Sequence, residues 1–407
     1  MKKIALVTPI YLPAELSGSA NAILQLAQGL SERGLDCSII TSNALTTRWW
    51  YDPVFGKKIS EKSEIINGVK IFRLACCQPL SFVALAGRCF KMFLPKSIFK
   101  KLEFLSSGPV LMGLFDLLKK EGFAAIYSSP LPCYLNQQVA DAILRLSPPP
   151  KFIIHPAFHV FISHYHNPEF QNVFDVANLI HVKSKSEKED IQKVFNIPDN
   201  KFAIIPFFLD LTSMKELAEI DKEVLNFRKK HNLENKKIVL STSGKNHLKG
   251  ATTLSQALNI LSKKNPDILL VIIGDNSLNR EKTKAETEIK NIINLGYVTD
   301  EEKEVIFAAS DIFCLPSVAE SFGISYLEAW KYKKPVIGAD IPIVRELILG
   351  NRGGLLVKFG DGKELAETIE KLAQNPVLVK ELGENGYQAI ISKYNSSKLI
   401  PEFEKLF

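Results

Sequence analysis

The chain has 407 residues, more than a single hydrophobic core usually supports, so two domains are expected. Its 46% hydrophobic and 23% charged residues are typical of a globular protein and exclude a disordered one. The formal net charge of +7 is compatible with anionic lipid or phosphorylated small molecules as partners. No nucleic-acid partner is expected, because the chain has no zinc finger, RNP-like aromatic pattern or arginine-rich tail.

No apolar run in the sequence is long enough to cross a bilayer. The opening MKKIALVTPIYLP lacks a small-residue cleavage site and is expected to form a buried first strand. The six cysteines show no CxxC pair and no metal-like spacing, which favours free thiols in a reducing cytoplasm. The expected location is therefore the cytoplasm, with the inner face of the membrane as the alternative.

Short apolar runs alternate with helix-like segments along the whole chain, which predicts an α/β fold with parallel sheets covered by helices. In the first half the strand-like runs are residues 2–11, 36–43, 69–75, 124–130, 151–156, 179–184 and 202–208. The alternation restarts in the second half, with strand-like runs at residues 236–244, 268–276, 292–298, 311–317, 334–340 and 353–359. The charged, helix-like stretch 211–236 lies between the two halves and suits a linker region.

Residues 85–104 break this alternation, because large apolar residues are mixed there with basic ones and a single acid. One interpretation is a solvated helix pair that covers the first domain. The other is a basic amphipathic segment that makes peripheral contact with an anionic membrane or a lipid acceptor. The basic residues are Arg88, Lys91, Lys96, Lys100 and Lys101.

The stretch PSVAESFGISYLEA, residues 316–329, joins a strand-like run to an amphipathic helix and contains two glutamates. Glu320 is expected in the turn, and Glu328 on the helix face of Ile324 and Leu327, where a carboxylate needs a partner. A pair of ligand hydroxyls would supply that partner. The alternative is that both glutamates are solvated and that Ser321 caps the helix.

The start of the same helix is expected near Phe322, where the backbone offers an anion site. The amides of Phe322, Gly323 and Ile324 have no intrahelical acceptor, and the helix dipole favours negative charge beside them. Gly323 would let a ligand approach the backbone closely.

The stretch STSGKNHLKG, residues 241–250, also follows a strand and opens a helix. A turn at Gly244 with Lys245 and Lys249 can neutralise a leaving diphosphate without a metal ion. The spacing is not that of a P-loop. An ordinary surface role for Lys249 is the alternative.

Four histidines, His155, His159, His164 and His166, lie within twelve residues of the sequence. His155 and His159 have the i, i+4 spacing of metal ligands, but Pro156 disfavours an ordinary helix there, so no metal site is expected. A plain structural role for these histidines stays open.

In order and spacing these stretches resemble the retaining family 4 glycosyltransferases of the GT-B fold. The two glutamates with seven residues between them match that family's E-x7-E motif, and the resemblance extends over nearly the whole chain. It implies two Rossmann-like domains with parallel sheets that face each other across a cleft. It further implies an acceptor-side domain at residues 1–208 and a nucleotide-sugar-binding domain at residues 209–390. Residues 391–407 are expected to form a C-terminal helix that packs back on the first domain.

The resemblance also assigns roles to individual residues. It implies that Glu320 contacts the transferred sugar, as does His155 or alternatively His159, and that Glu328 holds the ribose. Lys245 stands where the family usually has an arginine. The remaining expected donor contacts are the backbone of Gly18, the base pocket near Gly274, Tyr297 and Val298, and the phosphate site formed by Gly244, Lys249, Ser321, Phe322, Gly323 and Ile324.

The implied function is metal-independent transfer of a hexose, with retention, from a nucleotide diphosphate sugar to an acceptor hydroxyl. The first choice of donor is uridine diphosphate glucose, and guanosine diphosphate mannose is the next. The acceptor is expected to be a sugar or lipid-linked sugar in polysaccharide or glycolipid synthesis, and no cofactor is expected. No D-x-D triplet occurs in the sequence, which disfavours a metal-dependent transferase. A nucleotide-sugar epimerase of the same fold and a non-catalytic sugar-nucleotide-binding module are the alternatives.

Overall fold

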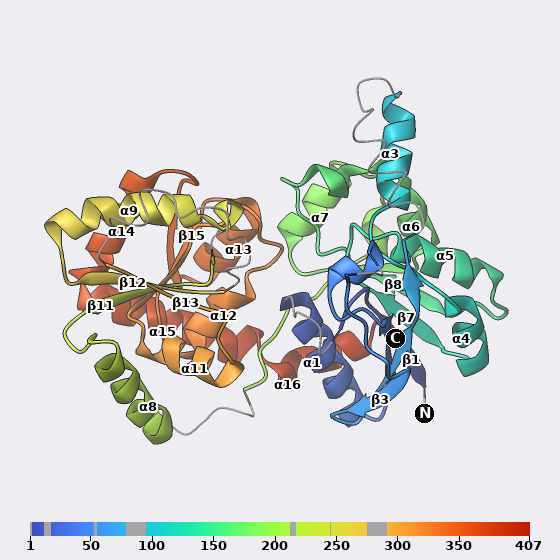
Figure 1. Cartoon of the computed structure of the whole chain (residues 1–407), viewed down its shortest axis with the longest axis horizontal. Helices are drawn as coiled ribbons and strands as arrows, with labels where there is room; N and C mark the ends of the chain where they lie inside the picture. Colours follow the sequence, from blue (N-terminus) through green and yellow to red (C-terminus); the bar gives the residue numbers. More distant parts are fainter. Residues whose placement is uncertain are drawn as a thin grey trace. The chain divides into compact units, whose positions relative to one another are not determined.

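The computed structural model describes residues 2–11, 18–52, 55–78, 95–211, 217–244, 246–274 and 291–407. The chain divides into two compact units (Figure 1). Unit 1 is Met1–Phe207 together with Ser396–Phe407, and unit 2 is Phe208–Asn395. Each unit contains one large sheet flanked by helices.

The large sheet of unit 1 has eight strands in the order β10-β9-β8-β7-β1-β2-β4-β3. All its pairings are parallel except that of the edge strand β3 with β4. The strands are β1 (Lys3–Val7), β2 (Asp36–Ser42), β3 (Ser63–Ile66), β4 (Val69–Leu74), β7 (Ala125–Ser128), β8 (Lys151–Ile154), β9 (Leu179–Val182) and β10 (Phe202–Ile204). A two-stranded antiparallel sheet, β5 (Cys76–Cys77) with β6 (Val110–Leu111), completes the strands described in this unit.

The central strands of unit 1 are buried on both faces, which is why they appear in the sequence as continuous apolar runs. Ile4 to Val7 of β1, for example, are fully buried. The described helices are α1 (Gly18–Glu32), α3 (Lys96–Leu105), α4 (Leu114–Glu121), α5 (Leu135–Arg145), α6 (Gln171–Val176), α7 (Lys185–Gln192) and α16 (Ser396–Glu404).

The last helix, α16, returns to unit 1 and packs against α1. Gly29 of α1 permits this approach, because a β-carbon at Gly29 would lie 2.5 Å from the side chain of Ile400. Arg33 at the end of α1 forms an ion pair with Glu404 at 2.5 Å. The carboxyl-terminal residues are thus part of the core of unit 1.

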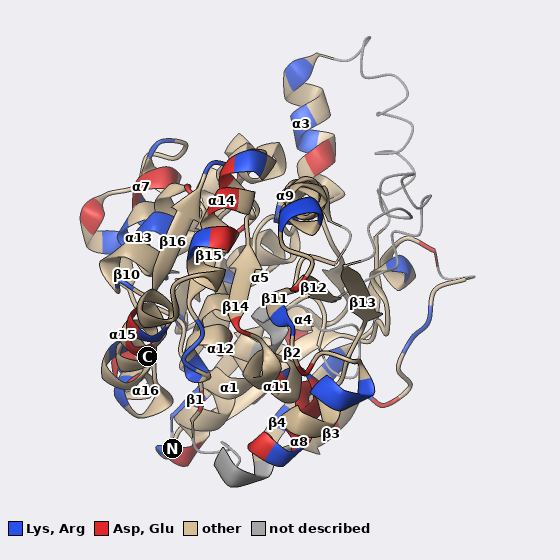
Figure 2. Cartoon of the chain, turned by 90° about the vertical axis from the view of Figure 1, so that its left-hand side faces the viewer, with Lys and Arg blue, Asp and Glu red and all other residues tan. Residues whose placement is uncertain are grey.

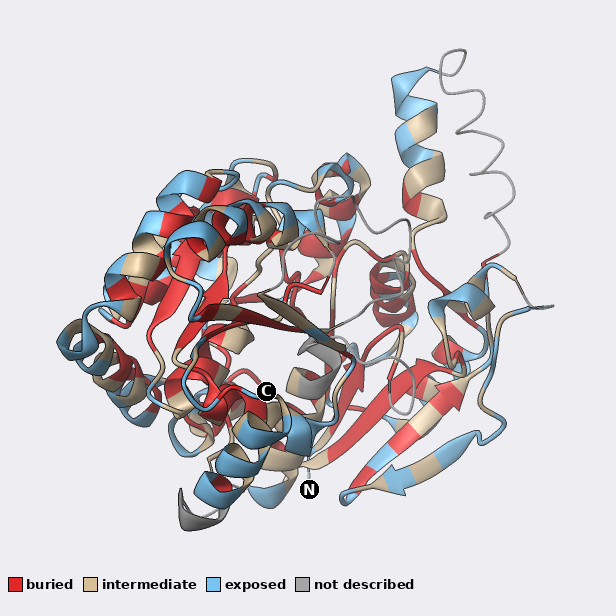
Figure 3. Ribbon diagram, turned by 60° about the vertical axis from the view of Figure 1, so that its left-hand side comes forward, coloured by how far each residue is buried: buried red, intermediate tan, exposed pale blue. Residues whose placement is uncertain are grey.

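The sheet of unit 2 has six strands, all parallel, in the order β13-β12-β11-β14-β15-β16. The strands are β11 (Lys237–Ser241), β12 (Ile268–Ile273), β13 (Ile292–Gly296), β14 (Ile312–Leu315), β15 (Val336–Ala339) and β16 (Gly354–Val357). The described helices are α8 (Leu217–Lys230), α9 (Ala251–Lys264), α11 (Asp300–Ala309), α12 (Ile324–Lys331), α13 (Pro342–Gly350), α14 (Gly362–Ala373) and α15 (Pro376–Lys393). Figure 3 shows buried strands covered by helices whose outer faces are exposed.

Helix α8 occupies most of the charged stretch 211–236, and it packs against α11 within unit 2. Arg228 of α8 donates to the carbonyl of Ala309 at the end of α11 and forms an ion pair with Asp311 at 3.0 Å. Asp311 in turn accepts from the amide of Ile238 at the start of β11. These contacts attach α8 to the amino-terminal edge of the sheet.

The predicted α/β fold with two parallel sheets is confirmed, and the strand order indicates where each unit would bind a ligand. In unit 2 the chain passes from β11 to β12 and β13 on one side, then to β14 on the other side of β11. In unit 1 the same reversal occurs around β1, which lies between β2 and β7. Ligands of open parallel sheets bind beyond the carboxyl ends of the strands at such a switch point.

Candidate active site

The switch point of unit 2 brings together the loops that follow β11 and β14. The amide of Val318 donates to the carbonyl of Leu248 at 3.0 Å, and the hydroxyl of Ser317 donates to the same oxygen at 3.3 Å. Gly250, which precedes α9, has a φ of +84°, and a β-carbon there would lie 2.4 Å from the carbonyl oxygen of Pro316. The two loops are therefore joined by backbone contacts that only glycine permits at position 250.

The loop after β14 ends at the start of α12, which differs in detail from the sequence-based expectation. Helix α12 begins at Ile324, and its N-cap is Gly323 with a φ of +92° and no side-chain cap. The interpretation of Ser321 as the cap is therefore wrong, because the left-handed backbone of Gly323 turns the chain into the helix instead. The hydroxyl of Thr242 in the β11 loop donates to that of Ser325 in the first turn of α12 at 3.3 Å.

The geometry of this helix start suits an anion. Amides in the first turn of a helix have no intrahelical acceptor, and they lie at the positive end of the helix dipole. A β-carbon at Gly323 would lie 2.4 Å from the ring of Tyr326, so this close packing against the positive-φ backbone requires glycine. Phe322 is buried, and its ring meets that of Tyr394 edge to face, with 6.0 Å between the centroids.

Glu320 lies in the loop between β14 and α12 and is half-buried. Below it the hydroxyl of Tyr326 donates to the carbonyl of Leu315 at 2.6 Å. Burial raises the pKa of Tyr326 well above its ordinary value, and the nearby charge of Glu320 raises it further. Tyr326 is therefore un-ionised and links α12 to β14 through this hydrogen bond, and Glu320 is a charged group near it.

Glu328 lies one turn into α12 and has a protein partner that the sequence pattern did not reveal. Its Oε1 lies 2.5 Å from Nζ of Lys303, which belongs to α11. The side chains of Lys303 and Glu328 are 29% and 21% exposed, so the pair is largely but not fully shielded from water. Glu328 thus has a partner within the protein, because α11 packs beside α12 and supplies a cation.

Lys249 is the last residue of a short 3-10 turn, His247–Lys249, between β11 and α9. Asn246 caps that turn by accepting from the amide of Leu248 at 2.9 Å. Among the residues that the structure describes, the ammonium group of Lys249 has no acidic partner within 4.0 Å. Lys249 is thus a cation at the switch point that is not neutralised by the described protein. Lys245 lies outside the described residues.

The loops that follow β11, β12 and β13 meet through backbone contacts. The amide of Gly274, after β12, donates to the carbonyl of Gly296 at 2.8 Å, and that of Gly244 donates to Ile273 at 3.3 Å. Gly274 has a φ of +118°, and a β-carbon there would lie 3.5 Å from the amide nitrogen of Gly244. The predicted base-pocket residues Gly274 and Tyr297 thus lie on adjacent loops, with the Tyr297 side chain 82% exposed and that of Val298 half-buried.

In unit 1, His155 directly follows β8 at the carboxyl edge of the sheet and is 2% exposed. Its Nδ1 lies 3.0 Å from the carbonyl oxygen of His181, which can only accept, so Nδ1 carries the proton. Burial, together with the charge of Lys183 and the neighbouring His181, holds the pKa of His155 well below 6.5. The imidazole is therefore neutral, and its Nε2 is a buried acceptor that no described group hydrogen-bonds.

The ring of His155 is held by a cluster of buried aromatic groups. The ring of His181 lies 4.6 Å away, and its Nε2 donates to the carbonyl of Ile205 at 2.7 Å. The hydroxyl of Tyr127 donates to Nδ1 of His181 at 2.8 Å. Sequence reasoning missed His181 and Tyr127, because they are far from His155 in the chain and only the parallel pairing of β7, β8 and β9 brings them together.

Gly18, His164 and His166 are further residues of unit 1 that the sequence analysis named. Gly18 is the first residue of α1, which follows β1 at the switch point of this unit. Nδ1 of His164 lies 2.7 Å from Oε1 of Glu103, and the ring of His166 stacks on that of Phe158. The described part of the chain contains no group of three or more histidine, cysteine, aspartate and glutamate side chains that could hold a metal ion.

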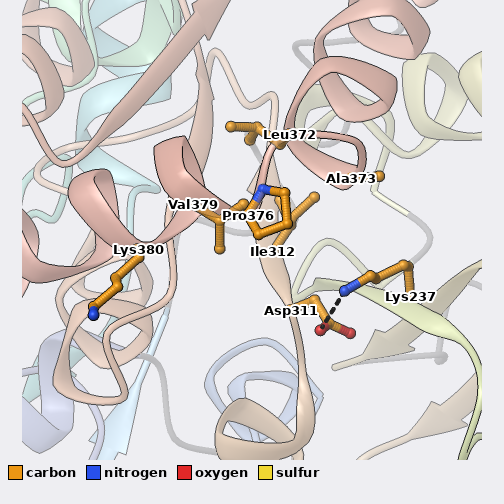
Figure 4. A pocket seen from close by; sticks show the side chains of 8 residues that line it. All are labelled: Lys237, Asp311, Ile312, Leu372, Ala373, Pro376, Val379 and Lys380. Carbon is orange, nitrogen blue, oxygen red and sulfur yellow. Dashed lines mark ion pairs between the residues drawn. The ribbon is translucent and has the colours of Figure 1, made fainter.

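A cavity of about 120 Å³ in unit 2 is separate from these loops (Figure 4). Lys237 and Asp311 line it, and they lie where β11 and β14 begin rather than where these strands end. Its floor is apolar, and the two charged residues form an ion pair at 3.7 Å. The cavity therefore lies at the opposite edge of the sheet from the switch point.

Of the basic segment 85–104, residues 85–94 lie outside the described residues. The remainder forms α3, in which Lys96, Lys100 and Lys101 are exposed and Phe104 is buried. Figure 2 shows basic positions, coloured blue, along α3. Ile98 is 48% exposed. None of the described helices is both long and apolar enough to cross a membrane.

Comparison with known proteins supports this reading of unit 2. Residues 223–389 match the family model of the glycosyl transferases group 1. The capsular polysaccharide biosynthesis glycosyltransferase of Staphylococcus aureus is 26% identical over 214 residues, 51% of this chain and 56% of that protein. An uncharacterized glycosyltransferase of Methanocaldococcus jannaschii is 23% identical over 415 residues, 98% of this chain and 96% of that protein.

The fold is shared with solved glycosyltransferases. The structure of Anabaena HepE with UDP and glucose aligns with a TM-score of 0.70 over 100% of this chain and 99% of that chain, at 15% identity. The family match covers the helix and strands around the switch point of unit 2, including Lys249, Glu320 and Glu328. The match places residues 223–389 in the glycosyl transferases group 1 family, and the chain is a glycosyltransferase with the GT-B fold.

Proposed function

We propose that the chain transfers a hexose, with retention of configuration, from a nucleotide diphosphate sugar to an acceptor hydroxyl. The observation that carries the proposal is the joining of the β11 and β14 loops at the switch point of unit 2. That contact places Lys249 and the start of α12 on adjoining loops, as the hydrogen bonds from Ser317 and Val318 to Leu248 require. A cation beside a helix start suits a diphosphate.

The proposed catalysis is electrostatic. Lys249, with Lys245 and the amides at the start of α12, would stabilise the charge that grows on the diphosphate as the bond to the sugar breaks. Removal of one such preorganised donor typically costs about 2.7–4 kcal/mol of barrier. Glu320 would accept hydrogen bonds from the transferred sugar, and Glu328 would hold the ribose hydroxyls. The departing phosphate can itself take the proton of the acceptor hydroxyl, so no separate base is required.

His155 has a matching role in the proposal. Its Nε2 is a neutral, buried acceptor because Nδ1 donates to the carbonyl of His181. A buried acceptor without a donor is costly, and a sugar hydroxyl would supply the donor. We assign Nε2 to a hydroxyl of the transferred sugar and the backbone of Gly18 to the donor phosphate. His159 remains the alternative contact.

Uridine diphosphate glucose is the proposed donor, with guanosine diphosphate mannose as the next choice. HepE, which shares the fold, was solved with UDP and glucose. The proposed acceptor is a sugar or lipid-linked sugar in polysaccharide or glycolipid synthesis, in line with the capsular polysaccharide relative.

A thermal-shift screen of nucleotide sugars tests this assignment, because a ligand that binds the native state raises its melting temperature. We expect a nucleotide diphosphate sugar to raise the melting temperature of the wild-type chain, and Lys249→Ala to reduce that rise. A screen in which no nucleotide sugar stabilises the chain would contradict the proposal.

The segment 85–104 is proposed to rest on an anionic membrane surface. Its described part, α3, has three exposed lysines and an exposed Ile98. Flotation with vesicles that contain anionic lipid should carry the wild-type chain upward and leave behind the variant with Lys96, Lys100 and Lys101 changed to Gln. Equal flotation of the two proteins would contradict this contact.

A further inference from the structure

Two ion pairs join α11 and α12, and only one of them involves a residue of the proposed site. Lys303 of α11 contacts Glu328 of α12, with 2.5 Å between Nζ and Oε1. Glu304 of α11 contacts Lys331 of α12, also with 2.5 Å between Nζ and Oε1. The signs are reversed between the pairs, so each helix contributes one cation and one anion. The second pair is a contact between the helices outside the proposed site, which raises the question of what the first pair adds to that site.

Lys303 is protonated at neutral pH. Burial lowers the pKa of Lys303, but the opposing attraction of Glu328, with the neighbouring Asp300 and Glu304, more than offsets burial and raises it. The ammonium group therefore stays protonated and donates a charge-assisted hydrogen bond, which is shorter and stronger than a neutral one. The Glu328 side chain, which has three rotatable bonds, is thereby held in one orientation before any ligand binds.

The contact leaves the carboxylate able to bind a diol. An ionised carboxylate accepts hydrogen bonds on both oxygens, and Lys303 engages only Oε1 of Glu328 among the described residues. Oε2 is available to one hydroxyl, and Oε1 retains room for another. Two neighbouring hydroxyls on one ring are the ligand that fits such a fixed pair of acceptors.

Helix α11 also links Glu328 to the loop proposed to read the base. Its N-cap, Thr299, directly follows Tyr297 and Val298, and a reciprocal capping box between Thr299 and Glu302 fixes the first turn. Lys303 lies in the same turn, with its amide bonded to the carbonyl of Thr299 at 2.9 Å. The base loop and the ribose acid are therefore connected through one rigid turn.

We propose that Lys303 is a positioning residue for nucleotide binding, which holds the Glu328 carboxylate in the orientation that accepts the two ribose hydroxyls. Lys303 need not touch the nucleotide, because it acts through Glu328. This inference rests on the proposed ribose role of Glu328.

Isothermal titration calorimetry with a nucleoside diphosphate and its 2′,3′-dideoxy analogue tests the inference. Uridine and guanosine diphosphates are both titrated, and the one that binds the wild-type chain is used. The dissociation constant of the dideoxy analogue is divided by that of the parent diphosphate, and this ratio measures the contribution of the ribose hydroxyls alone. Because an unfixed side chain must be ordered on binding, Lys303→Met should reduce this ratio about three- to tenfold, and Lys303→Arg should restore most of it.

Lys331→Met is the matched control, because it breaks the companion pair between the same helices without touching Glu328. We expect it to lower the melting temperature about as much as Lys303→Met and to leave the ratio at the wild-type value. An unchanged or increased ratio in Lys303→Met, or an equal loss in Lys331→Met, would overturn the inference.

The variant Glu328→Gln distinguishes a failure of the positioning role of Lys303 from a failure of the proposed function. If Glu328→Gln removes the preference for the ribose hydroxyls and Lys303→Met does not, only the positioning role fails. If Glu328→Gln leaves the ratio unchanged, or if neither diphosphate binds the wild-type chain, the ribose assignment and the proposed function fail with it.

Discussion

Glu320 and Glu328 lie eight positions apart, but the structure holds them in different ways. Glu320 is half-buried in the loop between β14 and α12, near the buried Tyr326. Glu328 is on a helix and is tied to Lys303. Glu320 is proposed to lie near the bond that breaks, whereas Glu328 is proposed only to hold the ribose. Substitutions at the two sites should therefore change different kinetic quantities.

Glu320→Gln keeps the size of the side chain and removes its charge. If Glu320 binds the transferred sugar more strongly in the transition state, kcat should fall about 10²–10³-fold, the range found for loss of one preorganised group. The dissociation constant for the nucleoside diphosphate should stay within about twofold, because the diphosphate carries no hexose. Steady-state kinetics and calorimetry measure the two quantities.

Glu367→Gln on α14 is a control for this substitution, because its carboxylate is 64% exposed and pairs only with the exposed Lys363. It should leave kcat unchanged. A Glu320→Gln variant with normal kcat would remove Glu320 from the chemistry.

The buried histidines of unit 1 make stability depend on pH. Burial lowers the pKa of His181 to about 3 and that of His155 well below 6.5. Below pH 6.5 the unfolded chain binds protons that the folded chain does not, so stability is lost as pH falls from 6.5 toward these lowered values. Each such histidine should cost about 1.4 kcal/mol per pH unit in that window.

Urea unfolding of the wild-type chain and of His155→Gln at pH 7.5, 6.5 and 5.5 tests this dependence. The wild type should lose more stability between pH 6.5 and 5.5 than the variant, by the contribution of one histidine. Parallel losses in the two proteins would show that His155 titrates normally in the folded state.

At the scale of elements, the two loops of unit 2 depend on one glycine. Gly250 has a φ of +84°, and a β-carbon there would lie 2.4 Å from a backbone oxygen of Pro316. Gly250→Ala should therefore lower the free energy of unfolding by about 1–3 kcal/mol, the cost of one strained backbone position. It should also weaken nucleotide binding, because the β11 and β14 loops would move apart. Urea unfolding and calorimetry measure these effects.

Gly350→Ala is the comparison for Gly250→Ala. Gly350 ends α13, has no positive φ, and a β-carbon there would have no atom within 4 Å. This variant should be at least as stable as the wild type, because alanine favours a helix over glycine. Equal effects at positions 250 and 350 would mean that the contact with Pro316 is unimportant.

The strands and glycine turns were predictable from the sequence wherever the local residue pattern decides them. Apolar runs such as residues 268–273 are buried strands, and the glycine turn at Gly244 lies just after β11 as expected. The exact start of α12 was not predictable, because the left-handed backbone of Gly323 and its fit against Tyr326 depend on packing. Lys303 was not predictable either, since nothing local marks a residue 25 positions before Glu328 as its partner.

At the scale of the whole molecule, the chain consists of two units that each have their own sheet and core. The alternation of strands and helices was sufficient to predict both parallel sheets. The antiparallel edge strand β3 and the contact of Ile400 with Gly29 depend on tertiary packing and are not visible in the pattern. The predicted site residues are distributed over both units, and the assignment of a shared role to them remains part of the proposal.

The retained transfer of a hexose is tested most directly by proton NMR of the chain incubated with uridine diphosphate glucose and, separately, guanosine diphosphate mannose. Glycosyltransferases that bind a donor without an acceptor can pass the sugar slowly to water, and the first product shows its anomeric configuration before it equilibrates. We predict that one of these donors, both α-linked, releases the α-anomer of its hexose first, and that Lys249→Ala abolishes the release. Release of the β-anomer first, conversion of the donor to an epimeric nucleotide sugar, or absence of any turnover of either donor would contradict the account.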